Sequence, residues 1–430
     1  MKTVTSSGCD RISYLPINII ENILVNLPIK DAVRTSILST EWRYKWATLP
    51  KIVFDYESRI KSKLIKIVHQ VLLIHVGYIK KFELSGLALR SCSGIDKWIL
   101  FLSRNAIEEL ILHIDVGGGG GKYTLPSSLF HCKQLRYLEL RGCIFRIPPT
   151  SKGLGFNHLK RLRLYNITFV GSTIGCLISS CPLLEILELD DFNGLTDIEV
   201  DAPNLILIYL CGSFRRICFK NCPLLVNVAI YKCGYSIGGS NYIDQGRRSN
   251  LIKALGGLAR IEELKLGNET MKFLATGNIP RKLPHIYNHL RRLYLDCITF
   301  CNLKVISVVF CLFKSVPKLQ RLEISAQLDK GAPRDMEPVL EFMEEQFHSG
   351  CFLNELQVVK MRYIYGMRVE LEFLKLLLAN APVLETMCIA PESEVTAAGS
   401  NMCKELLRFC RASPKAKILY FEPYEESDED

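Results

Sequence analysis

The chain has 430 residues, of which 48% are hydrophobic and 23% are charged. This is the composition of a globular protein, so it excludes a chain that is disordered throughout, and the length suggests about three domains. Lysine and arginine exceed aspartate and glutamate by ten, which is compatible with an acidic partner or with nucleic acid but requires neither.

The start of the chain has no apolar stretch of signal-peptide length. Its densest apolar run, Val305 to Phe313, is far shorter than the roughly 20 residues that span a bilayer. The 17 cysteines are an odd number, and no two of them form a Cys-x-x-Cys pair. We therefore expect an intracellular protein with no membrane segment, in the nucleus, the cytoplasm or both, whose cysteines are reduced and mostly serve as small core residues.

Three short helices are expected within residues 10–55. Pro16 suits the first turn of a helix that Pro28 ends, because the apolar residues between them have helical spacing. A second helix follows directly, and a Ser-Thr pair can cap a third helix that carries Trp42 and Trp46. Such a module makes a small core and leaves apolar surface for a partner.

Basic and apolar residues alternate between Arg59 and Ile67, which predicts an amphipathic helix with a solvated face. We expect this helix to link the first module to the segment that follows. Its basic face could contact an acidic protein surface, but a plain linker is the simpler interpretation.

From residue 79 onward the pattern apolar-x-x-apolar-x-apolar recurs twelve times, at a mean interval of about 28 residues, which is typical of leucine-rich repeats. The second and third apolar positions are two residues apart, so both side chains lie on one face of a strand. The copies begin at Ile79, Ile107, Leu135, Leu159, Leu184, Leu205, Leu225, Ile261, Leu290, Leu319, Leu353 and Leu384.

Prolines support this register, because in five copies a proline stands two residues before the first apolar position, where it ends the preceding helix. Each repeat would be a strand, a loop and a helix, and stacked repeats would form a curved solenoid. The intervals vary from 20 to 36 residues, which indicates inserted loops, above all the glycine-rich stretch between Leu225 and Ile261. The prolines are Pro182, Pro203, Pro223, Pro317 and Pro382.

The strands should line the concave face, with the residue between the two strand apolars pointing into it. We assign substrate binding to eight such residues: Glu83, Glu139, Arg163, Glu188, Tyr209, Lys265, Tyr294 and Glu323. The other four copies have Ile111, Ala229, Gln357 and Cys388 at this position. With the columns two residues before and after, the face has a formal charge of −2. It therefore suits a protein ligand better than a phosphate backbone, and we expect no nucleic-acid partner.

Residues suited to catalysis or metal binding form no recognisable pattern. The glycine run before Lys122 departs from the phosphate-loop pattern at its first-glycine and hydroxyl positions. His285-x3-His289 and Cys297-x3-Cys301 contain ligand types that zinc prefers, but the repeats already explain their positions. No Ser-His-Asp order or nucleophile elbow is present. We expect neither catalysis nor a metal or other cofactor.

Residues 10–50 resemble an F-box, and the C-terminal block resembles the FBD motif. Glu41 and Lys45 depart from the usual F-box pattern, which has a basic and an apolar residue there. With the repeats between the two motifs, the chain resembles the plant F-box/FBD/LRR-repeat family. The F-box matches are Leu15-Pro16, Ile19-Ile20, Ile23-Leu24, Leu27-Pro28, Lys30-Asp31, Val33, Ser36, Leu38-Ser39, Trp42-Arg43 and Trp46; the FBD matches include Gly350-Cys351, Leu356, Gly366, Glu370, Phe373-Leu374, Leu377-Leu378 and Leu384-Glu385.

This resemblance implies a substrate receptor without catalytic activity. The F-box would dock on a Skp-family adaptor, which links it to a cullin–RING ubiquitin ligase, and the repeats would hold the protein to be ubiquitinated. Ile20, Leu24 and Leu38 could equally be core residues. The alternative is an interaction scaffold outside the ligase, whose altered third helix binds the adaptor weakly. Carried over by position, the adaptor-binding residues would be Leu15, Pro16, Ile19, Ile20, Leu24, Leu27, Pro28, Leu38 and Trp42.

The expected fold is α/β: a three-helix F-box, then a curved leucine-rich-repeat solenoid that runs into the FBD region. The tail carries six Asp and Glu residues and is interpreted as a solvated end, with a role in partner binding as the alternative. The expected parts are a flexible N-terminus (1–9), the F-box (10–55), the linker helix and solenoid (56–345), the FBD region (346–421) and the acidic tail (422–430).

Overall fold

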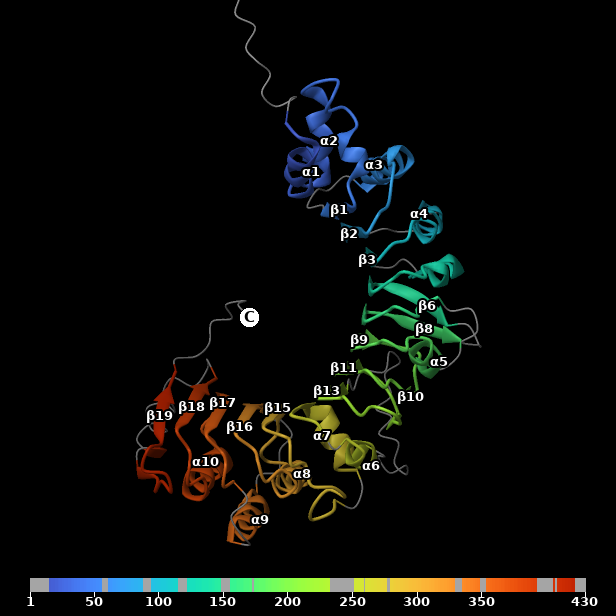
Figure 1. Ribbon diagram of the computed structural model, residues 1–430. Coiled ribbons are helices and arrows are strands. Elements are labelled where there is room, and N and C mark those ends of the chain that lie inside the picture. Colours follow the sequence, from blue (N-terminus) through green and yellow to red (C-terminus); the bar gives the residue numbers. More distant parts are fainter. Residues whose placement is uncertain are drawn as a thin grey trace, which may run out of the picture. The chain divides into compact units, whose positions relative to one another are not determined.

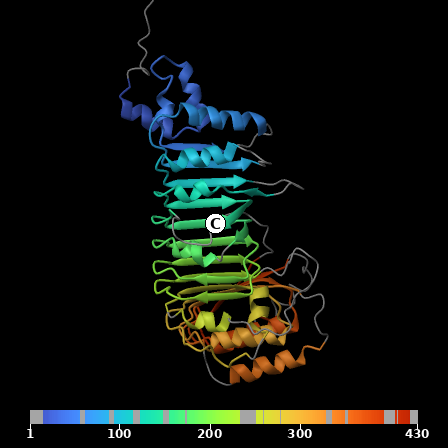
Figure 2. The same ribbon diagram turned by 90° about the vertical axis from the view of Figure 1, so that its right-hand side faces the viewer.

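The computed structural model describes residues 15–55, 61–87, 94–114, 122–147, 155–171, 174–232, 251–258, 260–276, 279–328, 335–348, 353–392, 405–406 and 408–421. The expected flexible N-terminus, the glycine run, the glycine-rich loop and the acidic tail all lie outside these residues. The chain divides into two compact units, Met1–Leu184 with Phe192–Gly194, and Glu185–Asp191 with Leu195–Asp430. Within each unit, strands stack side by side and helices or short strands pack behind them (Figures 1 and 2).

The first unit begins with α1 (Ile17–Val25) and α2 (Ile29–Arg34), followed by the 3-10 helices η1 (Thr35–Ile37) and η2 (Lys45–Thr48). Pro16 and Pro28 are the N-cap residues of the two α-helices. A backbone N–H at this position has no acceptor within the helix, so proline, which lacks the N–H, costs no helical hydrogen bond there. The positions of both prolines confirm the helix boundaries predicted from the sequence.

The third predicted helix is reduced to turns and the single 3-10 turn of η2. Its polar cap is present nonetheless, because the Ser39 hydroxyl oxygen accepts the N–H of Trp42 at 3.3 Å. Leu49 is already extended, and the chain enters a strand at Lys51, so the helical conformation ends at Thr48. Both Trp42 and Trp46 are buried in the resulting core.

The sheet of the first unit contains β1 (Lys51–Asp55), β2 (Lys81–Leu87), β3 (Glu109–Ile114), β5 (Tyr137–Arg141) and β7 (Arg161–Tyr165), in that order. Val53 of β1 pairs with Glu83 of β2, so β1 is a repeat strand that the sequence pattern did not reveal and that lies in the segment assigned to the F-box. The Pro50 carbonyl accepts the N–H groups of Lys80 and Lys81 at 2.8 and 3.0 Å. The same two-donor contact recurs at the following repeats, so the N-terminal helices continue directly into the repeat array.

The second unit has a sheet ordered β9, β11, β13 to β19. Neighbouring strands from β11 to β19 pair in parallel, as leucine-rich repeats require, and the register shifts only between β15 and β16 and between β17 and β18. Its strands are β9 (Ile186–Phe192), β11 (Leu207–Gly212), β13 (Asn227–Lys232), β14 (Glu263–Gly267), β15 (Arg292–Ile298), β16 (Arg321–Ala326), β17 (Val358–Ile364), β18 (Thr386–Pro391) and β19 (Lys417–Tyr420).

One repeat starts three residues later than its apolar pattern suggested. Lys360 pairs with Glu323, and the Gln357 N–H donates to the Gln320 carbonyl at 2.9 Å, so Leu356 and not Leu353 is the first apolar position. The predicted register at Leu353 is therefore wrong, and Gln357 is not the central residue of its strand. Both leucines are buried, and the apolar pattern cannot decide which of them enters the strand.

Behind the main sheet, each repeat carries a short strand, a helix or both, and the choice depends on the length of the repeat. The repeats that begin at Leu184 and Leu205 span 21 and 20 residues, too few for a helix, and carry β10 (Asp197–Val200) and β12 (Arg216–Phe219), which pair with each other. A three-stranded sheet of β4 (Tyr123–Thr124), β6 (Cys143–Ile147) and β8 (Thr168–Gly171) has the same role in the first unit. The prediction of a helix in every repeat is therefore wrong for the repeats that begin at Leu184 and Leu205, whereas the repeats with β4 and β8 also contain η3 (Ser127–His131) and α5 (Ile174–Ser179).

Helices occupy the back of the longer repeats. The basic, amphipathic segment forms α3, which confirms the predicted helix with later bounds. Because α3 lies between the paired strands β1 and β2, it belongs to a repeat, and the prediction that it links the F-box to the repeats is wrong. Within the described ranges, none of the helices combines the length and the apolarity that a membrane crossing requires. The helices are α3 (Lys61–Ile74), α4 (Gly94–Ser103), η3 (Ser127–His131), α5 (Ile174–Ser179), α6 (Leu251–Gly256), α7 (Asn268–Leu274), α8 (Leu303–Phe313), α9 (Glu337–His348) and α10 (Arg368–Asn380).

Candidate functional site

Helix α1 carries two apolar stripes, and only one of them faces the core. Ile20 and Leu24, four residues apart, are 3% and 0% exposed. Ile19 and Ile23 form a neighbouring stripe and are both 41% exposed, and Ile17 is 51% exposed. Because water-exposed apolar side chains gathered on one surface usually mark a protein contact, the outer stripe is a candidate docking surface.

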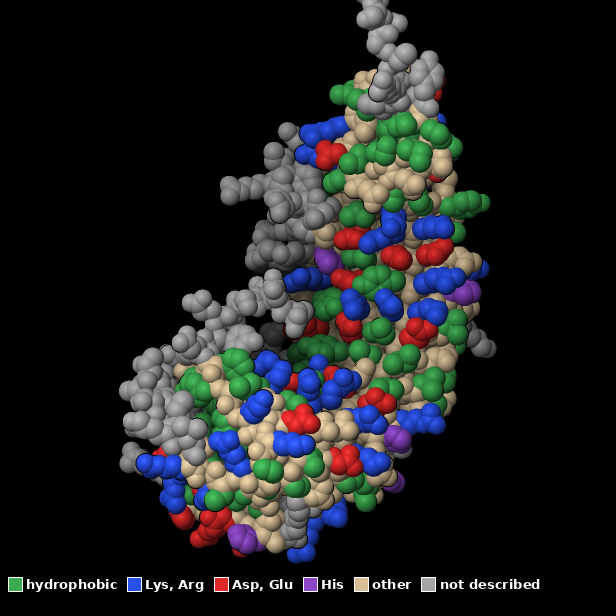
Figure 3. All heavy atoms as spheres, turned by 60° about the vertical axis from the view of Figure 1, so that its left-hand side comes forward, with side chains coloured by type: hydrophobic (Ala, Val, Ile, Leu, Met, Phe, Trp, Pro, Cys, Tyr) green, Lys and Arg blue, Asp and Glu red, His purple; other side chains and the backbone are tan. Residues whose placement is uncertain are grey.

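This surface extends beyond α1. Ile37, Leu38 and Tyr44 lie between α2 and η2 and are exposed by 87%, 52% and 63%. Figure 3 shows hydrophobic side chains gathered over this part of the first unit. We call Pro16, Ile17, Ile19, Ile23, Ile37, Leu38 and Tyr44 the apolar surface of the N-terminal helices.

The structure divides the nine residues assigned to adaptor docking. Pro16, Ile19, Pro28 and Leu38 are exposed, and Leu15 and Leu27 are partly buried. Ile20, Leu24 and Trp42 belong to the core, so they can support the docking surface but have little area to offer it. The sequence analysis missed Ile17, Ile37 and Tyr44 as exposed apolar residues. The sequence does contain a signal for Ile37 and Tyr44: both are apolar residues that belong to no helically spaced set of apolar residues.

The eight residues assigned to substrate binding all lie at the central position of a strand and are all partly buried. In the first unit, Glu139 and Arg163 belong to one network, in which Glu139 contacts His113 Nε2 at 2.7 Å and accepts the hydroxyl of Tyr137. Arg163 donates to that Tyr137 oxygen at 3.4 Å. The hydrogen bond from His113 lowers the pKa of Glu139, while burial and the adjacent carboxylate raise the pKa of Tyr137 to about 12.

In the second unit, aromatic and charged side chains lie next to one another across the strands. The rings of Tyr209 and Tyr231 are 5.6 Å apart, and the Tyr231 hydroxyl donates to Asp296 at 2.7 Å. Lys265 Nζ lies 4.6 Å from the ring centre of Tyr294. Flat aromatic faces next to paired charges offer a surface typical of protein interfaces.

A basic patch covers the strand-lined face from β14 to β17. Glu323 is shared by Arg321 at 3.9 Å, Lys360 at 3.5 Å and Arg362 at 3.8 Å, so one carboxylate faces three cations. Arg292 Nε contacts Glu263 at 2.8 Å, and Lys265 contacts the same carboxyl group at 3.1 Å. Figure 3 shows Lys and Arg side chains gathered on this face of the second unit.

The corrected register of β17 creates most of this patch. Val358, Lys360 and Arg362 take the three face positions that the sequence analysis gave to Glu355, Gln357 and Val359. The formal charge of the three columns therefore changes from −2 to +1. The formal charge of −2 predicted for this face is therefore wrong, because Lys360 and Arg362 of β17 bring basic side chains to it.

Metal binding and thiol chemistry find little support in the described part of the chain. No three His, Cys, Asp or Glu side chains gather there closely enough to hold a metal ion. Burial raises the pKa of the thiols of Cys132, Cys143 and Cys181 to about 12 each, so these cysteines stay protonated and act as small core residues.

Three family models match this chain. The model of an F-box domain matches residues 12–54, the model of FBD matches residues 345–389, and the model described as "FBD-associated F-box protein At5g56370, LRR repeats" matches residues 95–324. The last match covers more than half of the chain.

Curated proteins of Arabidopsis thaliana are similar over nearly the whole length. F-box/FBD/LRR-repeat protein At1g13570 is 38% identical over 96% of this chain and 99% of its own length. FBD-associated F-box protein At5g56370 is 27% identical over 89% of this chain and 90% of its own. Among solved structures, the LRR ectodomain of the Arabidopsis receptor kinase HAESA covers 79% of this chain and 78% of its own at 14% identity, with a TM-score of 0.22, which supports no further argument.

Proposed function

Because the chain belongs to the F-box/FBD/LRR-repeat protein family, we propose that it is the substrate-recognition subunit of a Skp–cullin–F-box ubiquitin ligase. Its F-box docks on a Skp-family adaptor, and its repeats bind the protein to be ubiquitinated. The protein carries out no chemistry itself and works in the nucleus, the cytoplasm or both.

The observation that carries the adaptor half of this proposal is the apolar surface of the N-terminal helices. The outer stripe of α1 exposes Ile19 and Ile23 although water disfavours large apolar side chains, and Ile37 is 87% exposed. A partner that covers such side chains removes their apolar area from water, at about 25 cal/mol per Å². Ile20 and Leu24 hold the stripe in place by packing on the inner side of the same helix.

The substrate half rests on the strand-lined faces. Regularly spaced strands place charged and aromatic side chains in rows, and no described residue covers the central positions of β5, β7, β14 and β15 completely. Glu139, Arg163, Lys265 and Tyr294 lie at these positions. Such rows offer many partly exposed groups for a protein ligand, whereas a small-molecule enzyme needs one enclosed site.

Adaptor binding is tested by isothermal titration of the purified chain with a Skp-family adaptor. We expect Ile19→Asp and Leu38→Asp each to weaken the affinity at least about thirty-fold, because each places a charge in an apolar contact. Leu73→Asp is the matched control, since Leu73 of α3 is 82% exposed but lies outside the proposed surface. Unchanged affinity in both F-box variants, with normal folding, would contradict the proposal.

The same titration tests the alternative of a scaffold outside the ligase. Glu41 is exposed next to the buried Trp42 and stands where the family usually has a basic residue. If the wild-type chain binds no adaptor and Glu41→Arg restores binding, the scaffold function is favoured. If the wild-type chain binds and Glu41→Arg changes the affinity by less than about three-fold, the departure from the family pattern has no consequence for docking.

A further inference from the structure

The strand-lined face of the second unit carries excess positive charge close to the end of the chain. Over β16 to β19, its positions include the cations Arg321, Lys360, Arg362 and Lys417 but only one acid, Glu323. Glu323 contacts the first three cations at 3.9, 3.5 and 3.8 Å, and Lys417 is exposed and makes no ion pair with any residue that the structure describes. We call the four cations the C-terminal basic region, which with Glu323 has a formal charge of +3.

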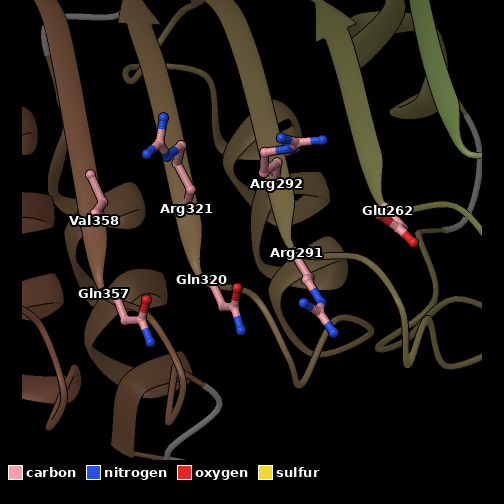
Figure 4. A pocket seen from close by; sticks show the side chains of 7 residues that line it. All are labelled: Glu262, Arg291, Arg292, Gln320, Arg321, Gln357 and Val358. Carbon is pink, nitrogen blue, oxygen red and sulfur yellow. The ribbon is translucent and has the colours of Figure 1, made fainter.

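The arginines at the strand starts do not converge on one site. Arg291, Arg292 and Arg321 line a cavity of about 360 Å³ at the starts of β15, β16 and β17, and they point in different directions (Figure 4). A single small anion needs several donors that meet at one point. Cations spread over several strands are better suited to a chain segment whose negative charges are spread along its length.

Such a segment follows β19 directly. Residues 422–430 have no lysine or arginine, so their formal charge is opposite in sign to that of the C-terminal basic region. They contain six acids: Glu422, Glu425, Glu426, Asp428, Glu429 and Asp430.

The acidic tail is long enough to reach these cations. Lys360 of β17 and Leu419 of β19 both pair with Cys388 of β18, so they lie in one row of the sheet, two strands apart. Two strand spacings are about 10 Å, whereas nine extended residues span about 30 Å. The first residues after Phe421 therefore start within reach of Lys360 and its neighbours.

The surface between the tail and these cations is apolar and accessible. Leu419 and Phe421 are exposed by 43% and 46%. A segment that turns back after Phe421 covers these side chains and removes their apolar area from water. The tail itself contains Pro423 and Tyr424 among its acids, which suit such a contact.

We propose that the acidic tail, residues 422–430, folds back on the strand-lined face and occupies the C-terminal basic region. A short tether keeps the tail at an effective concentration of order 1 mM, so several weak surface ion pairs are enough to hold it. A protein substrate that uses this part of the face must displace the tail. This regulatory consequence rests on the proposed function, whereas the contact between tail and face does not.

The contact is tested with a fluorescein-labelled peptide of residues 422–430, measured by fluorescence anisotropy at low salt. We expect the peptide to bind a chain ending at Phe421 at least about ten-fold more tightly than the full chain, whose own tail occupies the region. Lys360→Gln with Arg362→Gln in the shortened chain should weaken peptide binding at least about ten-fold, because two of the four cations are lost. Equal binding to the full and the shortened chain would overturn the proposal.

Arg408→Gln with Lys415→Gln in the shortened chain is the matched control. Both residues are exposed and precede β19 in the last repeat, so the same charge is removed close to the tail but away from the strand-lined face. This variant should keep the peptide affinity within about two-fold. An equal loss of affinity in both double variants would show that binding follows the net charge of the chain, and the proposal would be wrong.

Carbodiimide coupling tests the same contact within the full chain, because it joins carboxylates directly to amines that they touch. Peptide mass spectrometry of the monomeric product should identify links between the tail and Lys360. Links to Lys415 without any to Lys360 would place the tail elsewhere and contradict the proposal. Links to Lys360 that occur only in covalent dimers would contradict it too, since the tail would then bind a second copy of the chain.

Adaptor co-purification is recorded for the full and the shortened chain in the same experiments. A chain that binds the adaptor but fails the peptide and coupling tests contradicts this inference and leaves the proposed function standing. A chain that passes these tests but binds no adaptor contradicts the proposed function and leaves the contact of the tail standing.

Discussion

The carboxylate of Glu370 accepts the backbone N–H of Met367 at 2.9 Å, across the first turn of α10. The same oxygen accepts the N–H of Tyr365 at 3.0 Å, and the side chain is completely buried. Burial raises the pKa of Glu370 to about 7, against the backbone hydrogen bonds, which lower it. A group that closes the start of a helix in the FBD region therefore titrates close to neutral pH.

This relationship predicts that the free energy of unfolding depends on pH. The folded chain holds the Glu370 proton more tightly than the unfolded chain, so the stabilisation is complete below the ordinary pKa of 4.5 and is lost as pH rises through about 7. We expect Glu370→Gln to remove about 2 kcal/mol of pH dependence between pH 5 and pH 8 and to be more stable than the wild type at pH 8. Urea unfolding at several pH values measures this, with Glu372→Gln as control. An unchanged pH dependence in Glu370→Gln would refute the assignment.

Leu24 and Ile23 are neighbours on α1 with opposite expected roles. Leu24 is fully buried, so Leu24→Ala should lower the free energy of unfolding by about 2–5 kcal/mol. Ile23 is 41% exposed, so Ile23→Ala should change stability by less than about 1 kcal/mol and should instead weaken adaptor affinity. Thermal unfolding and adaptor titration of both variants separate the two effects. Equal stabilities of the two variants would show that the stripes are assigned to the wrong faces.

Gly194 occupies a position that no other residue fits. Its φ is +86°, and a Cβ atom there would lie 2.2 Å from the carbonyl oxygen of Phe169. Gly194→Ala should therefore destabilise the first unit by more than about 2 kcal/mol, since both backbone strain and a steric clash oppose it. Gly257→Ala is the control, because the nearest atom there is 3.7 Å away, and should change the unfolding temperature little. Similar melting curves for both variants would contradict the predicted clash.

Asn302 caps α8, the most apolar helix of the second unit. Its side-chain oxygen accepts the N–H groups of Lys304 and Val305 at 3.1 and 3.3 Å. Asn302→Ala should lower the free energy of unfolding by about 0.5–2 kcal/mol. Asn302→Asp should keep most of the stabilisation that the cap provides, because aspartate also accepts these hydrogen bonds. Chemical denaturation of the two variants provides the measurement. A loss of the same size in Asn302→Asp would count against capping as the cause.

The apolar period of the repeats was enough to predict the strand-lined face. Glu83, Glu139 and Lys265 lie at the central strand positions assigned to them, because alternate residues of a strand necessarily face the same side. The period did not determine the register of β17, where Leu353 and Leu356 both satisfy the pattern. Hydrogen bonds to β16 decide that register, and with it the basic character that Lys360 and Arg362 bring to the face.

The sequence by itself also determined the module order and the boundaries of α1 and α2, because prolines and helical spacing act locally. It could not decide which apolar stripe of α1 is buried, since Ile19 and Ile20 are equally hydrophobic. Only the tertiary structure decided this: α1 packs on η2, and the core formed with Trp42 and Trp46 accepts Ile20 and Leu24 and leaves Ile19 and Ile23 in water. Burial depends on contacts between distant segments, and a local pattern does not contain them.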